Sequence, residues 1–458
     1  MAKKPGAISP QSSDLLLRDS RDYAIYVCEN RAIPAIEDGM KFGQRIALWL
    51  LRNRAEKVKT YALSGLMGYE RLYVHGETSA NNAISLLAAP FKNNVPLIEG
   101  LGAFGSRIAP VEGIGAPRYT EVRRSEAAKA FFYNDLDLVP LEDNSDGSNV
   151  QPQHFLPLIP VVLLNGVSGV AVGWSTEILP RSLKSIVAAC QDALAGKQPK
   201  VLEPFYNRYN IGVQSTGANQ WEFTGKVDIV DTSTVRIVEL PPGEKLDKFR
   251  ARLIAMEDEE SIVSFTDRST DCIDITVKMK RGSIAKWSSA DAIKFFKLTE
   301  KVTERIVLLN WGGTSIRTFS DPADLVTEYV EWRLGWYTKR YEKLRDDTLY
   351  ECNYWKALAA LFKDNFTVRL GKFANRVAVE EDVTAVTTKA KLVVDDKQLD
   401  RIVNLPTYRW TKAFEEEVKV RIAELEKEGA EYKAILASPT KLKAIYAAEL
   451  DELKKLKV

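Results

Sequence analysis

The sequence Gly115-Ala-Pro-Arg-Tyr-Thr-Glu121 places the phenol of Tyr119 directly after the guanidinium of Arg118. A free phenol has a pKa near 10, so only about 0.1% is ionised at neutral pH. To attack a phosphodiester it needs a base, a metal-bound partner or nearby positive charge. Arg118 supplies fixed charge and can hold a phosphate through two parallel hydrogen bonds. Tyr119 is therefore a candidate nucleophile, although a lone Tyr is far more often an ordinary core or surface aromatic.

Two segments further upstream carry more phosphate-binding chemistry. Residues 29–45 contain Arg31, Lys41 and Arg45, which can anchor flanking phosphates. His75, one of only two histidines, precedes Gly76 and can donate to a phosphate oxygen or pass a proton. The alternatives are a solvated helix face for the two cations one helical turn apart, and a capping or packed role for the histidine.

Composition limits the class of protein. With 458 residues, the chain is expected to form two to four subdomains. No apolar run approaches the ~20 residues that span a bilayer, so no membrane partner is expected. The N-terminus lacks the apolar core of a secretion signal, and the four cysteines are scattered, which together indicate the cytoplasm. The net charge of +2 does not itself indicate nucleic acid, but residues 41–59 and 107–124 are locally basic.

Hydrophobic periodicity predicts an α+β multidomain chain. Residues 1–18 are expected to form a tail and residues 19–148 a mainly helical domain, with helices in 40–51 and 83–91. Short helices joined by tight turns suit a helix-turn-helix type of DNA-binding core, or any small helical domain. Residues 137–153 are expected to be a loop or linker.

The middle of the chain, residues 149–318, is expected to be a mixed α/β domain. Buried strands are expected at 161–164, 170–172, 220–230, 234–239 and 271–279, and helices at 182–194 and 246–256. After residue 318, a long helix at 319–350 and a second at 413–458 flank a helical insert at 351–412. This pattern predicts an antiparallel coiled-coil arm with a globular end, or two amphipathic helices of a compact bundle.

Together these segments resemble the breakage-reunion subunit of type IIA DNA topoisomerases, as found in the gyrase A protein and in the medium subunit of the tailed-phage enzymes. The matching text is ENRAIP (29–34), DGMK (38–41), HGETSA (75–80), FGS (104–106), RY (118–119) and LIPVVLLNGVSGVAVG (158–173). Less specific matches are VELPP (238–242), FTDR (265–268) and QLDRIVNL (398–405).

The resemblance implies a winged-helix domain at 19–148, a tower domain at 149–318 and a coiled coil with a helical C-gate in the remainder. It implies that Tyr119 forms a 5′-phosphotyrosyl bond and that Arg118 stabilises the transition-state charge. It assigns DNA binding to Arg31, Lys41, Arg45, His75 and Thr78, and assigns to Ile159 the wedge between base pairs that bends the duplex.

The resemblance also implies which components lie outside this chain. Mg²⁺ and ATP would both be bound by a partner subunit with ATPase and TOPRIM domains, and no metal site is expected here. Two copies would dimerise through the C-gate, cut both strands of a DNA duplex, pass a second duplex and reseal, relaxing and decatenating DNA without negative supercoiling. If viral, the chain would act in the host-cell cytoplasm. The competing hypotheses are a non-catalytic DNA-binding or architectural protein with the same fold, and a helical scaffold with no nucleic-acid partner.

Overall fold

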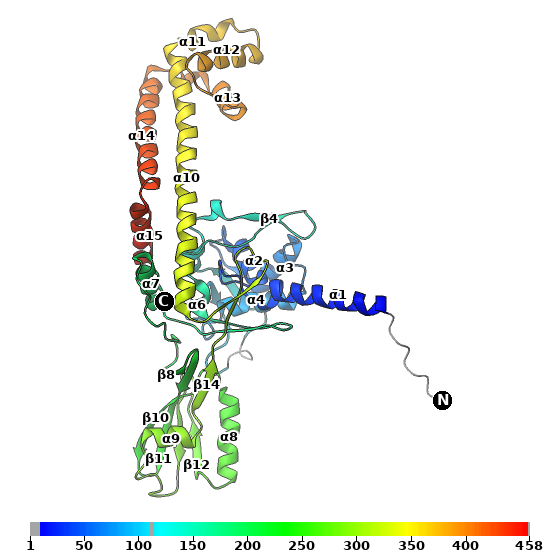
Figure 1. The fold of residues 1–458 in the computed structure, drawn as a ribbon, viewed down its shortest axis with the longest axis vertical. Coiled ribbons are helices and arrows are strands. Elements are labelled where there is room, and N and C mark those ends of the chain that lie inside the picture. The colour runs from blue at the N-terminus through cyan, green and yellow to red at the C-terminus, as the bar shows by residue number, and fades with distance from the viewer. Residues whose placement is uncertain (1–9, 110–113, 457–458) are drawn as a thin grey trace, which may run out of the picture. The chain divides into compact units, whose positions relative to one another are not determined.

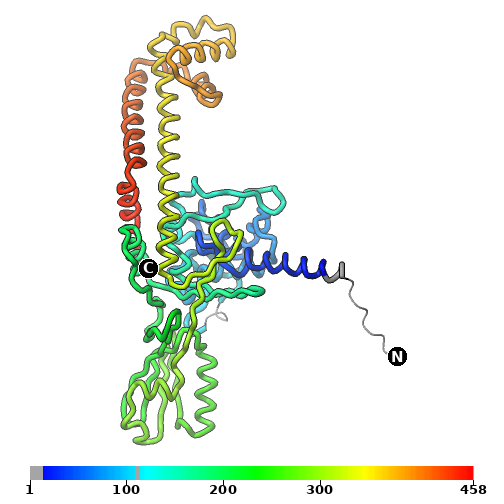
Figure 2. The backbone as a smooth tube through the Cα atoms, viewed as in Figure 1, coloured from blue at the N-terminus to red at the C-terminus, as the bar shows by residue number. Residues whose placement is uncertain are grey.

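The computed structural model describes residues 10–109 and 114–456 (Figures 1 and 2). The chain divides into two compact units. One ends at Arg333 and also takes in the chain from Glu449 onward, and the other is Leu334–Ala448. Each unit is described by itself. No helix among the described residues has the length and apolar character needed to cross a bilayer.

A small helical core with a three-stranded antiparallel sheet begins the first unit. The sheet has the order β1-β3-β2 and its helices pack against one another. Ile46, Leu48 and Leu51 on one helix are completely buried, which explains the helical spacing predicted for residues 40–51. The elements are η1 (Cys28–Ala32), α2 (Phe42–Leu51), β1 (Val58–Lys59), α3 (Thr60–Tyr69), α4 (Glu77–Ala88), β2 (Ile98–Leu101), β3 (Glu121–Arg124) and α5 (Glu126–Phe132).

Residues 136–152 are more ordered than the expected linker. A short helix, η2 (Leu136–Leu138), leads into a hairpin of β4 (Leu141–Asp143) and β5 (Val150–Pro152). The Asn144 side chain holds the turn by accepting a hydrogen bond from the Ser148 backbone N–H at 2.9 Å. This local side-chain bond explains how a polar, acidic sequence forms a fixed turn.

Residues 161–164 form a helix, so the strand expected there is wrong. The helix α6 (Val161–Asn165) follows Pro160 and all four of its apolar residues are buried. A short apolar run has no periodicity that separates a buried strand from a buried helix. Gly166 ends α6 with φ +66°, and a Cβ there would lie 2.5 Å from the Ile178 carbonyl oxygen.

A β-hairpin follows, made of β6 (Val167–Val170) and β7 (Ser175–Ile178). Only Val170 of the strand expected at 170–172 lies in it, at its end. Gly169 lets this hairpin approach the preceding backbone, since a Cβ there would lie 2.1 Å from the Ala32 carbonyl oxygen. The hairpin is thereby fixed close to the segment that carries Arg31.

The part of the first unit from Gly212 to Thr303 is called the sheet region below. It contains a four-stranded sheet of order β10-β11-β13-β12 and a three-stranded sheet of order β14-β9-β8. The strands expected at 220–230, 234–239 and 271–279 and the helix at 246–256 are present within a few residues. The elements are β8 (Gly212–Gly217), β9 (Gln220–Thr224), β10 (Lys226–Asp231), β11 (Thr234–Glu239), α8 (Leu246–Asp258), β12 (Ser264–Asp267), β13 (Ile275–Lys278), α9 (Ser289–Phe295) and β14 (Thr299–Thr303).

Three further elements complete the first unit. The helix expected at 182–194 is α7 (Leu183–Leu194), and β15 (Ile306–Leu309) pairs with β16 (Ile316–Phe319). A fully buried ion pair joins Arg181 to Glu304, so the start of α7 is tied to the end of the sheet region. At the N-terminal end, residues 10–18 belong to α1 (Pro10–Val27) rather than to the expected tail, while residues 1–9 lie outside the described residues.

In the second unit two long helices run antiparallel (Figure 1). Tyr341 on α10 (Pro322–Lys363) lies against Tyr432 on α14 (Lys412–Leu436), with ring centres 5.9 Å apart. The first helix continues past the expected end at residue 350 because Tyr354, Leu358 and Leu361 stay buried in one core. The remaining elements are α11 (Phe366–Arg369), η3 (Leu370–Lys372), α12 (Arg376–Lys389), α13 (Asp396–Val403), η4 (Thr407–Arg409) and α15 (Pro439–Leu453).

Candidate active site

Tyr119 projects from a turn just before β3, and 74% of its surface is exposed. Its backbone N–H donates to the Ala116 carbonyl at 2.8 Å, which closes the turn. The neighbouring Thr120 is buried and bonds Thr60 through both backbone (3.1 Å) and hydroxyl groups (2.8 Å). The phenol is therefore accessible at the surface while the backbone that carries it is fixed to the start of α3.

Arg118 lies beside this phenol, as expected. Its guanidinium carbon is 5.8 Å from the centre of the Tyr119 ring, and its side chain is also exposed. The turn thus presents a hydroxyl and a permanent positive charge together, and a phosphate between them can receive charge-assisted hydrogen bonds.

His75 is held on both ring nitrogens. Arg31 donates to Nδ1 at 3.0 Å, and the hydroxyl of Tyr26 lies 2.7 Å from Nε2. Because a guanidinium only donates, Nδ1 is unprotonated and the proton of the neutral ring is on Nε2, directed at the oxygen of Tyr26. Burial lowers the pKa of His75 below its ordinary 6.5, and the charge of Arg31 lowers it further. Tyr26, 49 residues away in sequence, was missed because no local pattern signals this contact.

Arg31, Lys41 and His75 line one cleft of about 680 Å³, together with Ser79 and Asn82 from α4. Lys41 donates to the Ser168 carbonyl of the β6–β7 hairpin at 2.9 Å, and burial lowers its pKa. The sequence-based grouping of Arg31, Lys41 and His75 is therefore present in space.

Thr78 and the Arg118–Tyr119 pair lie outside this lining. Thr78 is exposed on the first turn of α4, and neither Arg118 nor Tyr119 is among the described residues that line the cleft. The chain thus offers two separate groups of cations: one in the cleft and one beside the phenol.

Arg45 differs from the expectation. It is 8% exposed and makes a two-pronged ion pair with Asp38, at 2.6 and 3.0 Å. The same carboxylate accepts from the backbone N–H groups of Met40 (3.0 Å) and Phe155 (3.1 Å). In this structure Arg45 is a buried packing element, so the prediction that it contacts DNA is wrong for this conformation. A cation at helical spacing from Lys41 gave no sign of its buried partner.

Ile159 differs as well, because its side chain is completely buried. A buried side chain cannot enter a base stack, so the wedge expected at Ile159 is wrong for this conformation. The neighbouring hairpin instead exposes Val170 (80%) and Val172 (64%). The same stretch of sequence, residues 158–173, thus contains exposed apolar residues further along the chain.

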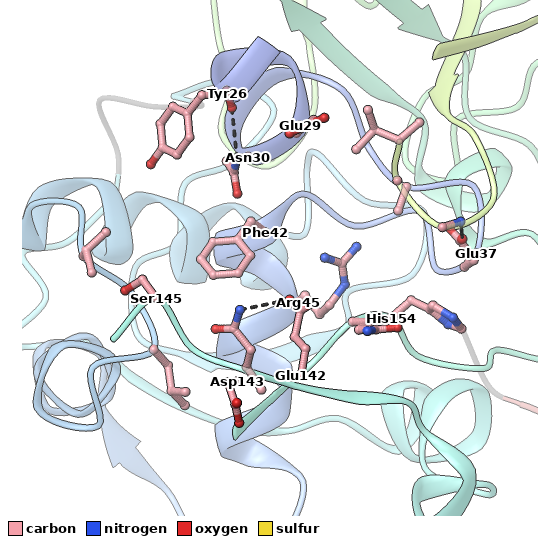
Figure 3. A pocket seen from close by; sticks show the side chains of 18 of the residues that line it. Tyr26, Glu29, Asn30, Glu37, Phe42, Arg45, Glu142, Asp143, Ser145 and His154 are labelled. Carbon is pink, nitrogen blue, oxygen red and sulfur yellow. Dashed lines mark hydrogen bonds between the residues drawn. The ribbon is translucent and has the colours of Figure 1, made fainter. Parts of the chain in front are cut away.

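A second cavity, of about 610 Å³, lies behind Tyr26 and Asn30 (Figure 3). Carboxylates of Glu29, Glu37, Glu142 and Asp143 line it. Burial raises the pKa of Glu37, which accepts a hydrogen bond from the Gly312 N–H at 2.6 Å. In the described part of the chain, no group of three or more His, Cys, Asp or Glu side chains is arranged to hold a metal ion.

The fold resembles a solved structure of the Plasmodium falciparum topoisomerase II DNA-binding, cleavage and re-ligation domain. The TM-score is 0.83 with 23% sequence identity, over 96% of this chain and 64% of that one. At this identity the likeness establishes the fold.

The sequence establishes the family. Residues 31–451 match the family model for the A subunit of DNA gyrase/topoisomerase IV. The chain therefore belongs to this family of type II topoisomerase cleavage and re-ligation proteins. It is 29% identical to the DNA topoisomerase medium subunit of Enterobacteria phage T4, over 94% of this chain and 96% of the relative. It is 30% identical to DNA topoisomerase 2-alpha of Gallus gallus over 69% of this chain, but spans only 21% of that relative's length.

Replacing Arg45 with Ala is expected to lower the free energy of unfolding by about 3–5 kcal/mol, because the Asp38 carboxylate stays buried without its cation. The matched control is Arg236→Ala, which breaks the half-exposed pair with Asp274 and is expected to cost no more than about 1 kcal/mol. Chemical denaturation measures both. Loss of duplex affinity at unchanged stability would instead support a direct DNA contact.

His75 is expected to make stability depend on pH in one direction. Its pKa is lower in the folded chain than the ordinary 6.5, so the unfolded chain takes up the proton first as pH falls. The free energy of unfolding should therefore decline below about pH 6.5 and level off below the folded pKa. Denaturation curves from about pH 7.5 to about pH 5 should be steeper in pH for the wild type than for His75→Asn, and equal slopes would contradict the assignment.

Proposed function

We propose that this chain is the DNA breakage-reunion subunit of an ATP-dependent type II topoisomerase, with Tyr119 as its nucleophile. The observation that carries the proposal is an exposed phenol beside an exposed guanidinium on a turn fixed at its base, in a chain of this family. The phenolic oxygen attacks a backbone phosphorus, and the bond from phosphorus to the 3′ oxygen of the adjoining sugar breaks. The phenol's proton ends on that 3′ oxygen, and the 5′ phosphate stays on Tyr119.

This exchange replaces one phosphoester with another, so it is reversible without a high-energy cofactor at that step. Arg118 neutralises the charge that grows on the phosphate oxygens in the transition state. Because Arg118 directly precedes Tyr119 on the same turn, its charge stays beside the phenol throughout the exchange.

The cleft supplies the second part of the DNA site. Arg31 and Lys41 line it and bind backbone phosphates, with Thr78 at the start of α4 as a hydroxyl donor. The ring of His75 acts as a positioning group, because both its nitrogens are occupied. Since His75 donates to the oxygen of Tyr26, the hydroxyl hydrogen of Tyr26 is the one that remains for a phosphate.

The β6–β7 hairpin bends the duplex. Val170, four-fifths exposed, enters between base pairs in place of the buried Ile159. Unstacking a base step costs a few kcal/mol and is offset by the larger surface that bent DNA contacts. The close approach at Gly169 keeps the hairpin next to the cleft that holds the phosphates.

Partner subunits complete the enzyme. The phage T4 relative is by name one subunit of several, and we place Mg²⁺ and ATP on an ATPase/TOPRIM partner. Leu16 and Leu17 of α1 are 57% and 69% exposed and offer that partner an apolar surface. A second copy of the chain joins through the second unit, whose Val377, Val393 and Tyr408 are exposed.

In the assembled enzyme two copies of Tyr119 cut the two strands, a second duplex passes and the break is resealed. Relaxation and decatenation without negative supercoiling, in the host-cell cytoplasm if the chain is viral, follow from the likeness to the phage protein. The winged-helix, tower, coiled-coil and C-gate assignments and their boundaries stay predictions.

Tyr119→Phe removes the nucleophilic oxygen and keeps the ring, so covalent DNA attachment should vanish while duplex affinity changes by less than about threefold. The chain is co-expressed with candidate ATPase partners, and denaturing gels and peptide mapping locate the adduct. Tyr61→Phe is the control, because Tyr61 is a half-exposed phenol whose N–H bonds Pro117 of the same turn. An adduct that persists in Tyr119→Phe would show that a different nucleophile acts, and no adduct in any variant would support a DNA-binding protein without this chemistry.

Val170→Ser should reduce the bend of a duplex of about 30 base pairs, measured by energy transfer between its ends at saturating protein. Ile159→Ala should lower thermal stability because it opens a cavity in the core, yet leave the bend of the folded protein unchanged. Val150→Ser, at an exposed position of the β4–β5 hairpin, is the control. The opposite ranking of the first two variants would return the wedge to Ile159.

A further inference from the structure

The chain between β2 and β3 leaves the small sheet, touches the sheet region and returns to Tyr119. Its base is closed by a bridge between Phe104 and Ile114 and by the Gly115 N–H, which donates to the Ala103 carbonyl at 2.7 Å. Tyr119 lies only a few residues beyond this closure. Any contact made by the described part of the excursion is therefore connected by a short path to the candidate nucleophile.

Arg107 makes such a contact. Only 10% of its side chain is exposed, and its guanidinium donates to the carbonyls of Leu240 (3.3 Å), Pro241 (3.1 Å) and Glu244 (3.3 Å). These three carbonyls belong to the connection between β11 and α8. The planar guanidinium satisfies several backbone acceptors at once, which a single ammonium group cannot do.

Two side chains of the first unit complete the surroundings of Arg107. Its guanidinium carbon lies 4.8 Å from the centre of the Tyr209 ring, and its Nε lies 3.7 Å from the carboxylate of Glu239. Face-on aromatic contact and a carboxylate both favour a cation at this place. The site therefore holds the side chain by charge and by shape.

The neighbouring residues fix the same contact. Ile108 packs against the apolar core of the sheet region. The turn that presents Arg107 and Ile108 is closed by the Ser106 N–H donating to the Ala109 carbonyl (3.0 Å) and by the Ala109 N–H donating to the Ser106 hydroxyl (3.2 Å). Residues 106–109 are thus bound to the sheet region as one small piece.

The base of the excursion is equally tight near Tyr119. A Cβ on Gly115 would lie 3.2 Å from Cγ2 of Thr120 and 3.4 Å from the Ala103 carbonyl oxygen. Thr120 is 2% exposed and follows Tyr119 directly. A shift of the base of the excursion therefore moves the turn that carries the phenol.

From these contacts we infer that Arg107 is a positioning residue that ties the Tyr119 turn to the sheet region. The inference rests on the proposed function, because it assigns to this tie the alignment of Tyr119 with the phosphate. Arg107 itself touches neither the phenol nor, in this structure, the cleft. Its effect is to make the place of the phenol depend on the place of the sheet region.

Hydrogen exchange of the whole chain tests the tie without requiring catalysis. In Arg107→Gln, the amides of Ala109 and Ser106 and also those of Gly115 and Tyr119 should exchange about tenfold faster or more. Arg236→Gln breaks an ion pair on the four-stranded sheet and should leave these amides unchanged. Faster exchange confined to residues 106–109 would overturn the inference, because the tie would then end at the sheet region.

Covalent attachment in the co-expressed assembly is the second measurement. At saturating duplex, Arg107→Gln should form the Tyr119 adduct about tenfold more slowly or worse, with duplex affinity within about threefold of wild type. Arg107→Lys keeps the charge and should recover part of the rate. A normal rate in a variant whose exchange at Gly115 and Tyr119 has risen would overturn the positioning role and leave the proposed function intact.

Two further outcomes separate the proposals. No adduct in the wild-type assembly would refute the proposed function itself, whatever the exchange data show. If Arg107→Gln does not fold, Ile108→Ala removes apolar packing from the same piece and leaves the guanidinium in place. It should produce the same pattern of exchange and rate in weaker form, and unchanged exchange and rate in Ile108→Ala would count against the inference.

Discussion

The buried carboxylate of Asp38 is the constraint on which the rest of the DNA-facing part depends. It is completely buried and accepts hydrogen bonds from Arg45, from the Met40 N–H and from the Phe155 N–H. One side chain thereby joins the segment before α2, α2 itself and the chain that leads to α6. An unpaired carboxylate in this place would be strongly unfavourable, so the three segments are held in one arrangement.

That arrangement sets where the cations lie. Lys41 directly follows the Asp38–Met40 turn and reaches the β6–β7 hairpin, while Arg31 reaches His75. The phenol of Tyr119 belongs to a different framework, fixed by Thr60, Thr120 and the excursion from β2 to β3. The candidate site is therefore composite: one framework holds the DNA backbone and another holds the reacting oxygen.

Sequence patterns predicted the parts of the fold whose signals are local. The spacing of Ile46, Leu48 and Leu51 indicated α2, and alternation indicated β11 and β13. The strand expected at Val161–Leu164 failed because an apolar run of four residues fits either state once it is buried. The hairpin at 141–152 was missed because the turn is held by side-chain bonds from Asn144, which hydropathy does not register.

The site divides along the same line. The neighbours Arg118 and Tyr119 were predictable because their chemistry is adjacent in sequence. The burial of Arg45 and Ile159, the exposure of Val170 and the contact from Tyr26 to His75 all depend on segments brought together by folding. The resemblance to a family supplied a function for each matching stretch, but the exposure of each side chain decided which residue within the stretch can perform it.

Gly169 sets a limit on how this region can vary. With only 2.1 Å between the position of a Cβ and the Ala32 carbonyl oxygen, even one methyl group would force the two backbones apart. The Lys41 ammonium lies 3.3 Å from the same point and would lose its seat on the Ser168 carbonyl. Sequence drift at this position is thus closed to every side chain, and changes in how sharply the duplex is bent must arise at exposed hairpin positions such as Val170 and Val172.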